Sequence, residues 1–199
     1  LMSKLELEKS ISFSLDKPYA MVTFHPVTLE DNKSREQIKA LLEALKLFKD
    51  MKFIFTKANA DSGGRAINQM IDEFVEKNNN SIAFNSLGMK RYLSTLKYCS
   101  LVIGNSSSGL VEAPSFGIPT INIGDRQKGR LQADSVINCE PIKEDIERAI
   151  KIALSEKFKE TSKNANNPYG DGNTSEKIVE IMKDFLMNDK INLKKKFYD

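Results

Sequence analysis

The chain has 199 residues, a formal net charge of +3 and a hydrophobic fraction of 40%, and its length suits one domain of roughly 150–200 residues with tails. Because the charge is small and dispersed, we expect no nucleic-acid partner. No apolar run approaches the roughly 20 residues of a membrane span, so we expect no membrane partner either.

The first residues, LMSKLELEKS, alternate apolar and charged side chains, which is unlike a signal peptide. Since the chain starts directly inside an amphipathic pattern, we expect an internal fragment of a longer protein. Cys99 and Cys139 have no CxxC or paired-histidine spacing. We therefore expect buried thiols in a reducing cytoplasm, with no metal and no cofactor.

Short apolar segments alternate with amphipathic segments, which predicts a doubly wound parallel sheet in a Rossmann-like α/β domain. The predicted strands are Tyr19–Thr23, Lys52–Phe55, Ser81–Phe84, Ser100–Gly104, Thr120–Ile123 and Ser135–Asn138. The predicted helices are Ser34–Asp50, Arg65–Lys77, Met89–Tyr98, Lys143–Ser155 and Ser175–Met187. Ser34 and Asn173 are the expected N-caps of the first and last of these helices. The polar stretch Lys157–Gly172 is predicted to be a loop.

The segment Leu101–Arg130 combines a buried strand, a small-residue turn, a short helix, a second strand and a basic loop. We expect the helix to begin directly after the turn and to end at Gly117. The N–H groups of a first helical turn have no intrahelical partner and attract anions. A phosphate is therefore expected to dock in this turn, on Ser106, Ser107, Ser108 and Gly109.

Glu112 lies about one turn into this helix, where a carboxylate would repel a phosphate unless it served another part of the ligand. A ribose diol is a natural partner for it. The alternative is that Glu112 only complements the helix dipole while the serines only cap the helix. The turn and the helix alone fit both interpretations. The rest of the segment favours the ribose, because a second strand at Thr120–Ile123 and the loop after Gly124 bring two ligand-binding loops side by side at one edge of the sheet.

His25 is the only histidine, and it follows the first predicted strand directly. A single histidine is often a structural residue, but ligands bind at the carboxyl edge of parallel sheets. This position therefore favours a role in the site.

Four further stretches stand out along the chain: VTFHPVTLED at 22–31, KANADSGG at 57–64, YGDGN at 169–173 and KKKF at 194–197. Together with Leu101–Arg130 they resemble the UDP-N-acetylglucosamine 2-epimerase family. The His-Pro-Val-Thr motif favours its hydrolysing branch, which releases N-acetylmannosamine for sialic acid synthesis, because non-hydrolysing members typically have His-Arg followed by Glu-Asn.

The resemblance implies the C-terminal half of a two-domain fold of the glycosyltransferase-B type. Residues 1–174 would bind UDP, and residues 175–199 would form a helix and tail that pack toward a missing N-terminal domain. As in the family that it resembles, UDP would leave by anti-elimination to give 2-acetamidoglucal, and water would then add. Because the family's catalytic carboxylates belong to the N-terminal domain, we expect the fragment alone to be inactive.

The resemblance also implies roles for individual residues. His25 would be the catalytic residue of this half, acting on the substrate's phosphate or on a proton. Tyr92 would cover the uracil, unless it only packs in the core, and Arg126 would reach the uracil or a phosphate, unless it is a surface charge. Asn59, in a loop with Lys57, Asp61, Ser62 and Gly63, would approach the sugar or the diphosphate, although an ordinary loop would look similar.

Two other functions stay open at this point. One is a glycosyltransferase of the same architecture, and the other is a non-catalytic nucleotide-sugar binding module. The sequence also leaves open the exact sugar, since a diacetylbacillosamine donor would need the same residues. It leaves the oligomeric state open, including a homo-oligomer.

Overall fold

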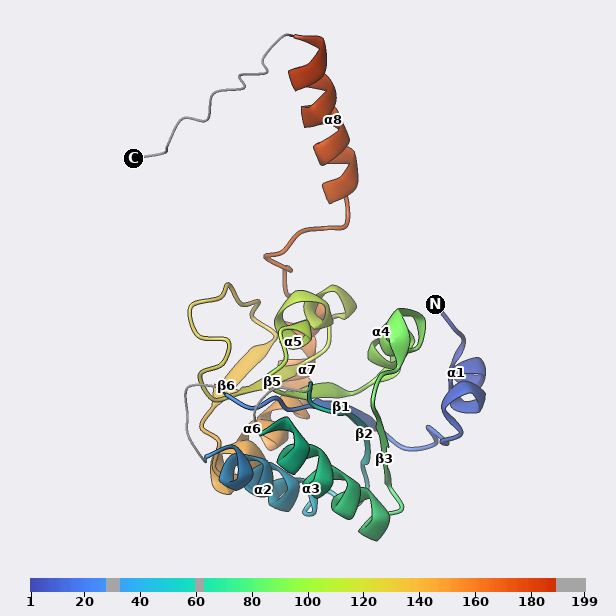
Figure 1. Ribbon diagram of the computed structural model, residues 1–199, viewed down its shortest axis with the longest axis vertical. Helices are drawn as coiled ribbons and strands as arrows, with labels where there is room; N and C mark the ends of the chain where they lie inside the picture. Colours follow the sequence, from blue (N-terminus) through green and yellow to red (C-terminus); the bar gives the residue numbers. More distant parts are fainter. Residues whose placement is uncertain (28–32, 60–62, 189–199) are drawn as a thin grey trace. The chain divides into compact units, whose positions relative to one another are not determined.

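The computed structural model describes residues 1–27, 33–59 and 63–188. The chain divides into two units, Leu1–Pro168 and Tyr169–Asp199. The first unit is a parallel sheet covered by helices on both faces, and the described residues of the second, 169–188, contain a single helix (Figure 1). The KKKF stretch lies outside the described residues, as do parts of the segments 22–31 and 57–64.

The sheet has six strands, and all of its neighbouring pairs are parallel. The spatial order is β3-β2-β1-β4-β5-β6. The strands are β1 (Tyr19–Thr23), β2 (Lys52–Thr56), β3 (Ser81–Phe84), β4 (Leu101–Gly104), β5 (Thr120–Ile123) and β6 (Val136–Cys139). The expected α/β fold with a doubly wound sheet is therefore confirmed, and the strand order reverses between β1 and β4.

The helices form two layers because their apolar faces belong to two separate core clusters. One cluster joins the sheet to α2 (Ser34–Leu45), α3 (Gly64–Lys77) and α6 (Lys143–Ala153). The other joins it to α1 (Lys4–Ile11), α4 (Gly88–Tyr98) and the η1 turn (Ala113–Phe116), beside α5 (Ser108–Val111). Figure 1 shows the first three helices on one side of the sheet and α1, α4 and α5 on the other.

The predicted loop Lys157–Gly172 is wrong over its first half, where the structure has α7 (Glu156–Lys163). Ser155 is the N-cap, and its side chain accepts a hydrogen bond from the backbone N–H of Phe158. The helix buries only Ser162, so its sequence has no apolar stripe to mark it.

Both ends of α2 differ from the prediction, whereas two other predicted end residues lie where they were expected. Helix α2 ends at Leu45 instead of Asp50, and its N-cap is Lys33 rather than Ser34, with no side-chain capping bond. Asn173 does occupy the N-cap of α8 (Thr174–Met187), but its side chain makes no capping bond. Gly117 ends its helical turn in a left-handed conformation, as expected.

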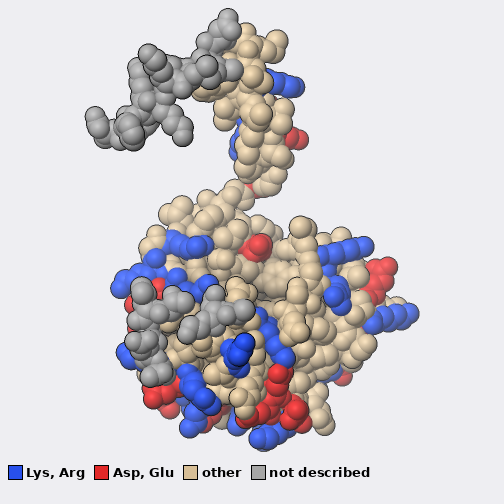
Figure 2. Space-filling model, in the orientation of Figure 1, with Lys and Arg blue, Asp and Glu red and all other residues tan. Residues whose placement is uncertain are grey.

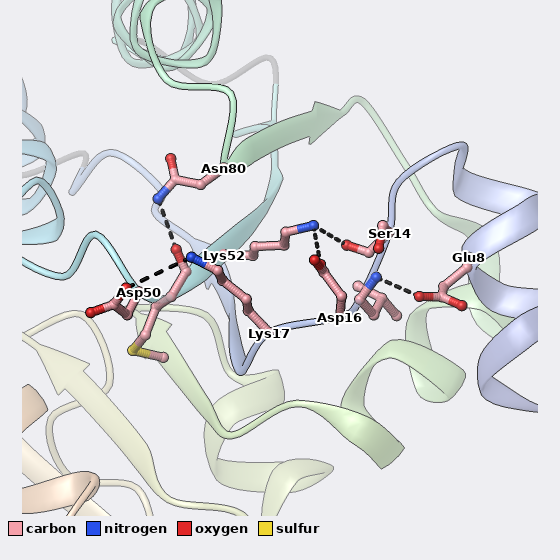
Figure 3. A network of polar contacts seen from close by, with 9 residues as sticks. Glu8, Ser14, Asp16, Lys17, Asp50, Lys52 and Asn80 are labelled. Carbon is pink, nitrogen blue, oxygen red and sulfur yellow. Dashed lines mark hydrogen bonds and ion pairs between the residues drawn. The ribbon is translucent and has the colours of Figure 1, made fainter.

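The N-terminal ends of the strands are closed by paired charges (Figure 3). Lys52 Nζ lies 2.5 Å from Asp16 Oδ1 and donates to the carbonyl of Ser14 at 2.7 Å. The same ammonium lies 4.8 Å from the centre of the Phe13 ring. Lys17 pairs with Asp50 at 3.7 Å. These contacts tie the segment after α1 to the start of β2.

No residue of α8 is buried. Its exposed apolar side chains recur at helical spacing and include Ile178, Ile181, Met182 and Phe185. Among the described residues, no helix is long and apolar enough to cross a membrane. Basic and acidic side chains are interspersed over the face of the first unit drawn in Figure 2, which gives no single-sign surface there.

Candidate functional site

The candidate site lies where the sheet changes direction, at the carboxyl ends of β1 and β4. The two strands pair in register, with Thr23 opposite Gly104. A Cβ on Gly104 would lie 1.8 Å from the carbonyl oxygen of Thr23, and the residue has a φ of +137°. Only glycine therefore allows the two strand ends to approach this closely.

A cavity of about 540 Å³ opens at this edge of the sheet. It is lined by the loops after β1 to β4 and by the N-terminal half of α4. Six of the predicted site residues line it: His25, Asn59, Tyr92, Ser106, Ser108 and Glu112. Sequence positions as far apart as 25 and 112 thus meet at one concave surface, as expected for loops at one edge of a parallel sheet.

Ser107, Gly109 and Arg126 are not among the residues that line this cavity. Gly109 is buried, and a Cβ there would lie 2.7 Å from the Cγ2 atom of Thr120. Its glycine is thus explained by close packing of α5 on β5. Arg126 donates from Nη1 to the carbonyl of Asn105 at 3.1 Å.

The serine turn differs from the expected anion cradle. The N–H of Ser108 donates to Ser106 Oγ at 3.4 Å, and the N–H of Gly109 donates to Ser106 O at 3.2 Å. Helix α5 has only four residues before it becomes the η1 turn, so its dipole is short. What the turn offers the cavity is mainly the side chains of Ser106 and Ser108.

Glu112 contributes a carboxylate to the wall of the cavity. Its Oε2 atom is buried and has no hydrogen-bond partner among residues 1–27, 33–59 and 63–188. A buried acceptor of this kind costs stability unless a donor reaches it. The arrangement suits a ligand that brings hydroxyl groups to this wall.

Tyr92 joins α4 to the serine turn by donating its hydroxyl hydrogen bond to Ser108 Oγ. Burial raises the pKa of this tyrosine to about 12, and the nearby Glu112 carboxylate acts in the same direction. The ring both lines the cavity and packs against the core cluster of α1 and α4. It therefore presents an uncharged aromatic surface to a ligand.

The loop after β2 contributes less charge to the cavity than its sequence indicates. Lys57 lines the cavity, but its Nζ lies 2.7 Å from both carboxylate oxygens of Asp72 on α3, so its charge is paired. Asn59 lines the cavity. Asp61 and Ser62 lie outside the described residues.

Two residues that the sequence did not identify as part of the site organise its loops. Asn105 is 1% exposed and Gln127 is 2% exposed. The carboxamide of Asn105 bonds the main chain of His25, and Gln127 Nε2 donates to the carbonyl of Asn105 at 2.8 Å. The sequence feature that could have identified Asn105 is its position directly after a strand that ends in glycine.

The described residues contain no cluster of three or more histidine, cysteine or acidic side chains that could hold a metal ion. Both cysteines are free, Cys99 buried and Cys139 half-buried. Burial raises the pKa of each thiol to about 12, so both are protonated at neutral pH.

Residues 1–183 match the family model for UDP-N-acetylglucosamine 2-epimerase. A Campylobacter jejuni protein named GDP/UDP-N,N'-diacetylbacillosamine 2-epimerase (hydrolyzing) is 42% identical over 80% of this chain and 41% of its own length. An Escherichia coli protein named polysialic acid biosynthesis protein P7 is 41% identical over the whole chain and 50% of its own length. The chain thus spans half or less of these relatives.

The solved structure of S. aureus MnaA with UDP superposes with a TM-score of 0.71 at 20% identity. The match covers the whole of this chain and 52% of the MnaA chain. At this identity the likeness establishes the fold alone. This chain has the fold of about half of the MnaA chain.

Proposed function

The chain belongs to the UDP-N-acetylglucosamine 2-epimerase family, and from that membership we propose that it is the C-terminal, UDP-binding half of a hydrolysing 2-epimerase with the two-domain glycosyltransferase-B architecture. The observation that carries this proposal is the cavity at the β1/β4 reversal, which His25, Ser106 and Glu112 line together. Within the described part of the chain, the buried Oε2 atom of Glu112 has no hydrogen-bond partner. Relatives of about twice this length support the assignment to one half of a longer protein.

Within the cavity, which Glu112 lines together with Tyr92 and Ser108, Glu112 is proposed to accept hydrogen bonds from the ribose diol, since its Oε2 has no partner in the part of the chain that the structure describes. Tyr92 is proposed to cover the uracil with its neutral ring. Ser106, Ser108 and His25 are proposed to face the diphosphate, and Ser107, Gly109 and Arg126 to support this end from outside the cavity wall. Asn59 is proposed to approach the sugar.

The proposed reaction converts UDP-N-acetylglucosamine and water into N-acetylmannosamine and UDP. In the first step the C1–O bond to UDP breaks as a proton leaves C2, giving 2-acetamidoglucal, and water then adds across the double bond. Donors aimed at the departing diphosphate lower the barrier to the first step. We assign that role to this chain, and the base at C2 to the half that it does not span.

The names of three relatives support the proposed hydrolysing reaction and its place in sialic acid synthesis. The C. jejuni relative and one from Legionella pneumophila, 30% identical, are both named hydrolysing diacetylbacillosamine epimerases. The name of the E. coli relative supports a place in sialic acid synthesis. Diacetylbacillosamine is therefore the second candidate sugar for this chain.

We propose that the exposed apolar face of α8 packs against the other half of the longer protein. Ile178, Ile181 and Phe185 are each about half exposed or more within this chain, and an uncovered apolar stripe of this kind favours a partner surface. The two free cysteines support the expected cytoplasmic location.

Product analysis of the longer protein with UDP-N-acetylglucosamine tests the function. We expect free UDP and N-acetylmannosamine without any acceptor. A glycoside formed only with an acceptor would instead establish a glycosyltransferase, and unchanged nucleotide sugar would establish a binding module. The same assay with UDP-diacetylbacillosamine decides between the two sugars.

A further inference from the structure

Asn105 holds the main chain of His25 with both ends of its carboxamide. The N–H of His25 donates to Asn105 Oδ1 at 2.7 Å, and Asn105 Nδ2 donates to the carbonyl of His25 at 2.8 Å. A donor and an acceptor on one planar group fix both the position and the orientation of the bonded residue. Because Asn105 is 1% exposed, water does not compete for these bonds.

The main chain of Asn105 is fixed in turn by the neighbouring loops. Its N–H donates to the carbonyl of Thr23 at 3.1 Å. Its carbonyl accepts from Gln127 Nε2 at 2.8 Å and from Arg126 Nη1 at 3.1 Å. The loops after β1, β4 and β5 therefore meet at one buried residue.

Asn105 does not line the cavity, whereas His25 and Ser106 do. From this arrangement we infer that Asn105 is a positioning residue, which sets the His25 imidazole against the hydroxyl of Ser106. The inference rests on the proposed function, because it assumes that these two groups meet the diphosphate of UDP. A site that is fixed before the ligand arrives loses less conformational freedom on binding.

The two bonds to His25 explain why this position needs asparagine. Aspartate is nearly isosteric but has no amide donor for the carbonyl of His25, and alanine lacks both groups. Gln127 does not provide a substitute, because its Nε2 already serves the carbonyl of Asn105.

His25 is the only histidine in the chain, so its imidazole signals in a proton–carbon NMR spectrum can be assigned without ambiguity. We compare the 199-residue chain with N105A and with the matched control N122A. Asn122 is also a buried asparagine, 4% exposed, and it lies opposite Gly104 on β5 with its amide bonded to Asn138.

In N105A we expect the His25 signal to shift and to broaden or split, and the UDP dissociation constant to rise about tenfold, as for the loss of two buried hydrogen bonds. In N122A we expect a single sharp His25 signal and a dissociation constant within about twofold of wild type. If circular dichroism shows N105A to be unfolded, N105D replaces it, with the same expected changes.

The inference is overturned if the N105 variant keeps the wild-type His25 signal or the wild-type affinity for UDP. It is also overturned if N122A has the same effect, since a general loss of packing would then explain both. If the wild-type chain binds no UDP, the proposed function fails, while the His25 signal in the free chain still tests whether Asn105 fixes this residue.

Discussion

The polar groups at the two ends of the sheet differ in how completely they are paired. At the N-terminal ends of the strands, Lys52 is paired with Asp16, capped by the Ser14 carbonyl and stacked on Phe13. At the carboxyl ends, Glu112 keeps a buried oxygen without a partner in the described part of the chain, beside a cavity of about 540 Å³. The paired contacts stabilise the fold, whereas we propose that a ligand reaches Glu112 at the other end.

This comparison predicts that changes at the two ends separate stability from binding. Substitutions at the paired end should lower stability and leave UDP affinity unchanged. Substitution of Glu112 at the other end should lower UDP affinity with little loss of stability.

The largest effect is expected for Gly104→Ala, which should lower both the stability of the fold and the affinity for UDP. A Cβ would lie 1.8 Å from the carbonyl of Thr23, so β1 and β4 must separate where the site begins. We expect a loss of about 3 kcal/mol or more in the free energy of unfolding, measured by urea denaturation. A variant as stable as wild type would show that the two strand ends are not packed as described.

Glu112→Ala should affect binding alone. Removing a buried acceptor that has no partner among the described residues relieves a desolvation cost, so we expect a melting temperature equal to or above that of wild type. The UDP dissociation constant should rise about tenfold or more if two ribose hydroxyls lose their acceptor. Calorimetric titration with UDP checks this, and an unchanged affinity would remove Glu112 from the site.

Lys52→Met, at the N-terminal ends of the strands, should affect stability alone. We expect a melting temperature lower by a few degrees and an unchanged affinity for UDP. Lys52 and Ser14 hold the pKa of Asp16 below its ordinary 3.8. The pair therefore stabilises the fold above that pH and loses this effect as the pH falls through the lowered pKa.

Lys52→Met should accordingly lose less stability than wild type when the pH is taken below about 4. Thermal melts of both proteins between neutral and acid pH provide the measurement. If the melting temperatures of the two proteins fell in parallel with pH, the Lys52–Asp16 pair would make no contribution to the pH dependence of stability.

Tyr92→Phe should have the smallest effect, since it keeps the ring and removes only the bond to Ser108. The pKa of Tyr92 is raised from 10.0 to about 12, so the unfolded chain releases this proton at a lower pH than the folded chain. Wild-type stability should therefore fall as the pH rises from 10 to about 12. The stability of the phenylalanine variant should fall less over this range. Chemical denaturation at several pH values measures the difference.

The strands were predictable because buried parallel strands are continuous apolar segments bounded by turns. Helix α7 was not, since it buries only Ser162 and carries no apolar stripe. Helix α2 ends before the last apolar residue of its pattern, Phe48, which packs on the core from the following turn. Periodicity thus identifies which side chains are buried better than it identifies where a helix stops.

The sequence could also identify the loops that form the site, because the carboxyl ends of parallel strands meet at one edge. It could not predict which groups face the cavity. The pairing of Lys57 with Asp72 and the bonds of Asn105 to His25 join residues 15 and 80 positions apart. Such contacts depend on which face of the sheet each side chain leaves, and a slip of one position reverses that face.

We propose that UDP binds at the carboxyl end of the sheet, between the loops of β1 and β4. Titration of the isotopically labelled chain with UDP, followed by NMR, tests it most directly. We predict shifts at His25, Ser106 and Glu112, and none at Asp16 or Lys52. Absence of any shift on saturation with UDP, or shifts concentrated around Lys52, would contradict the claim.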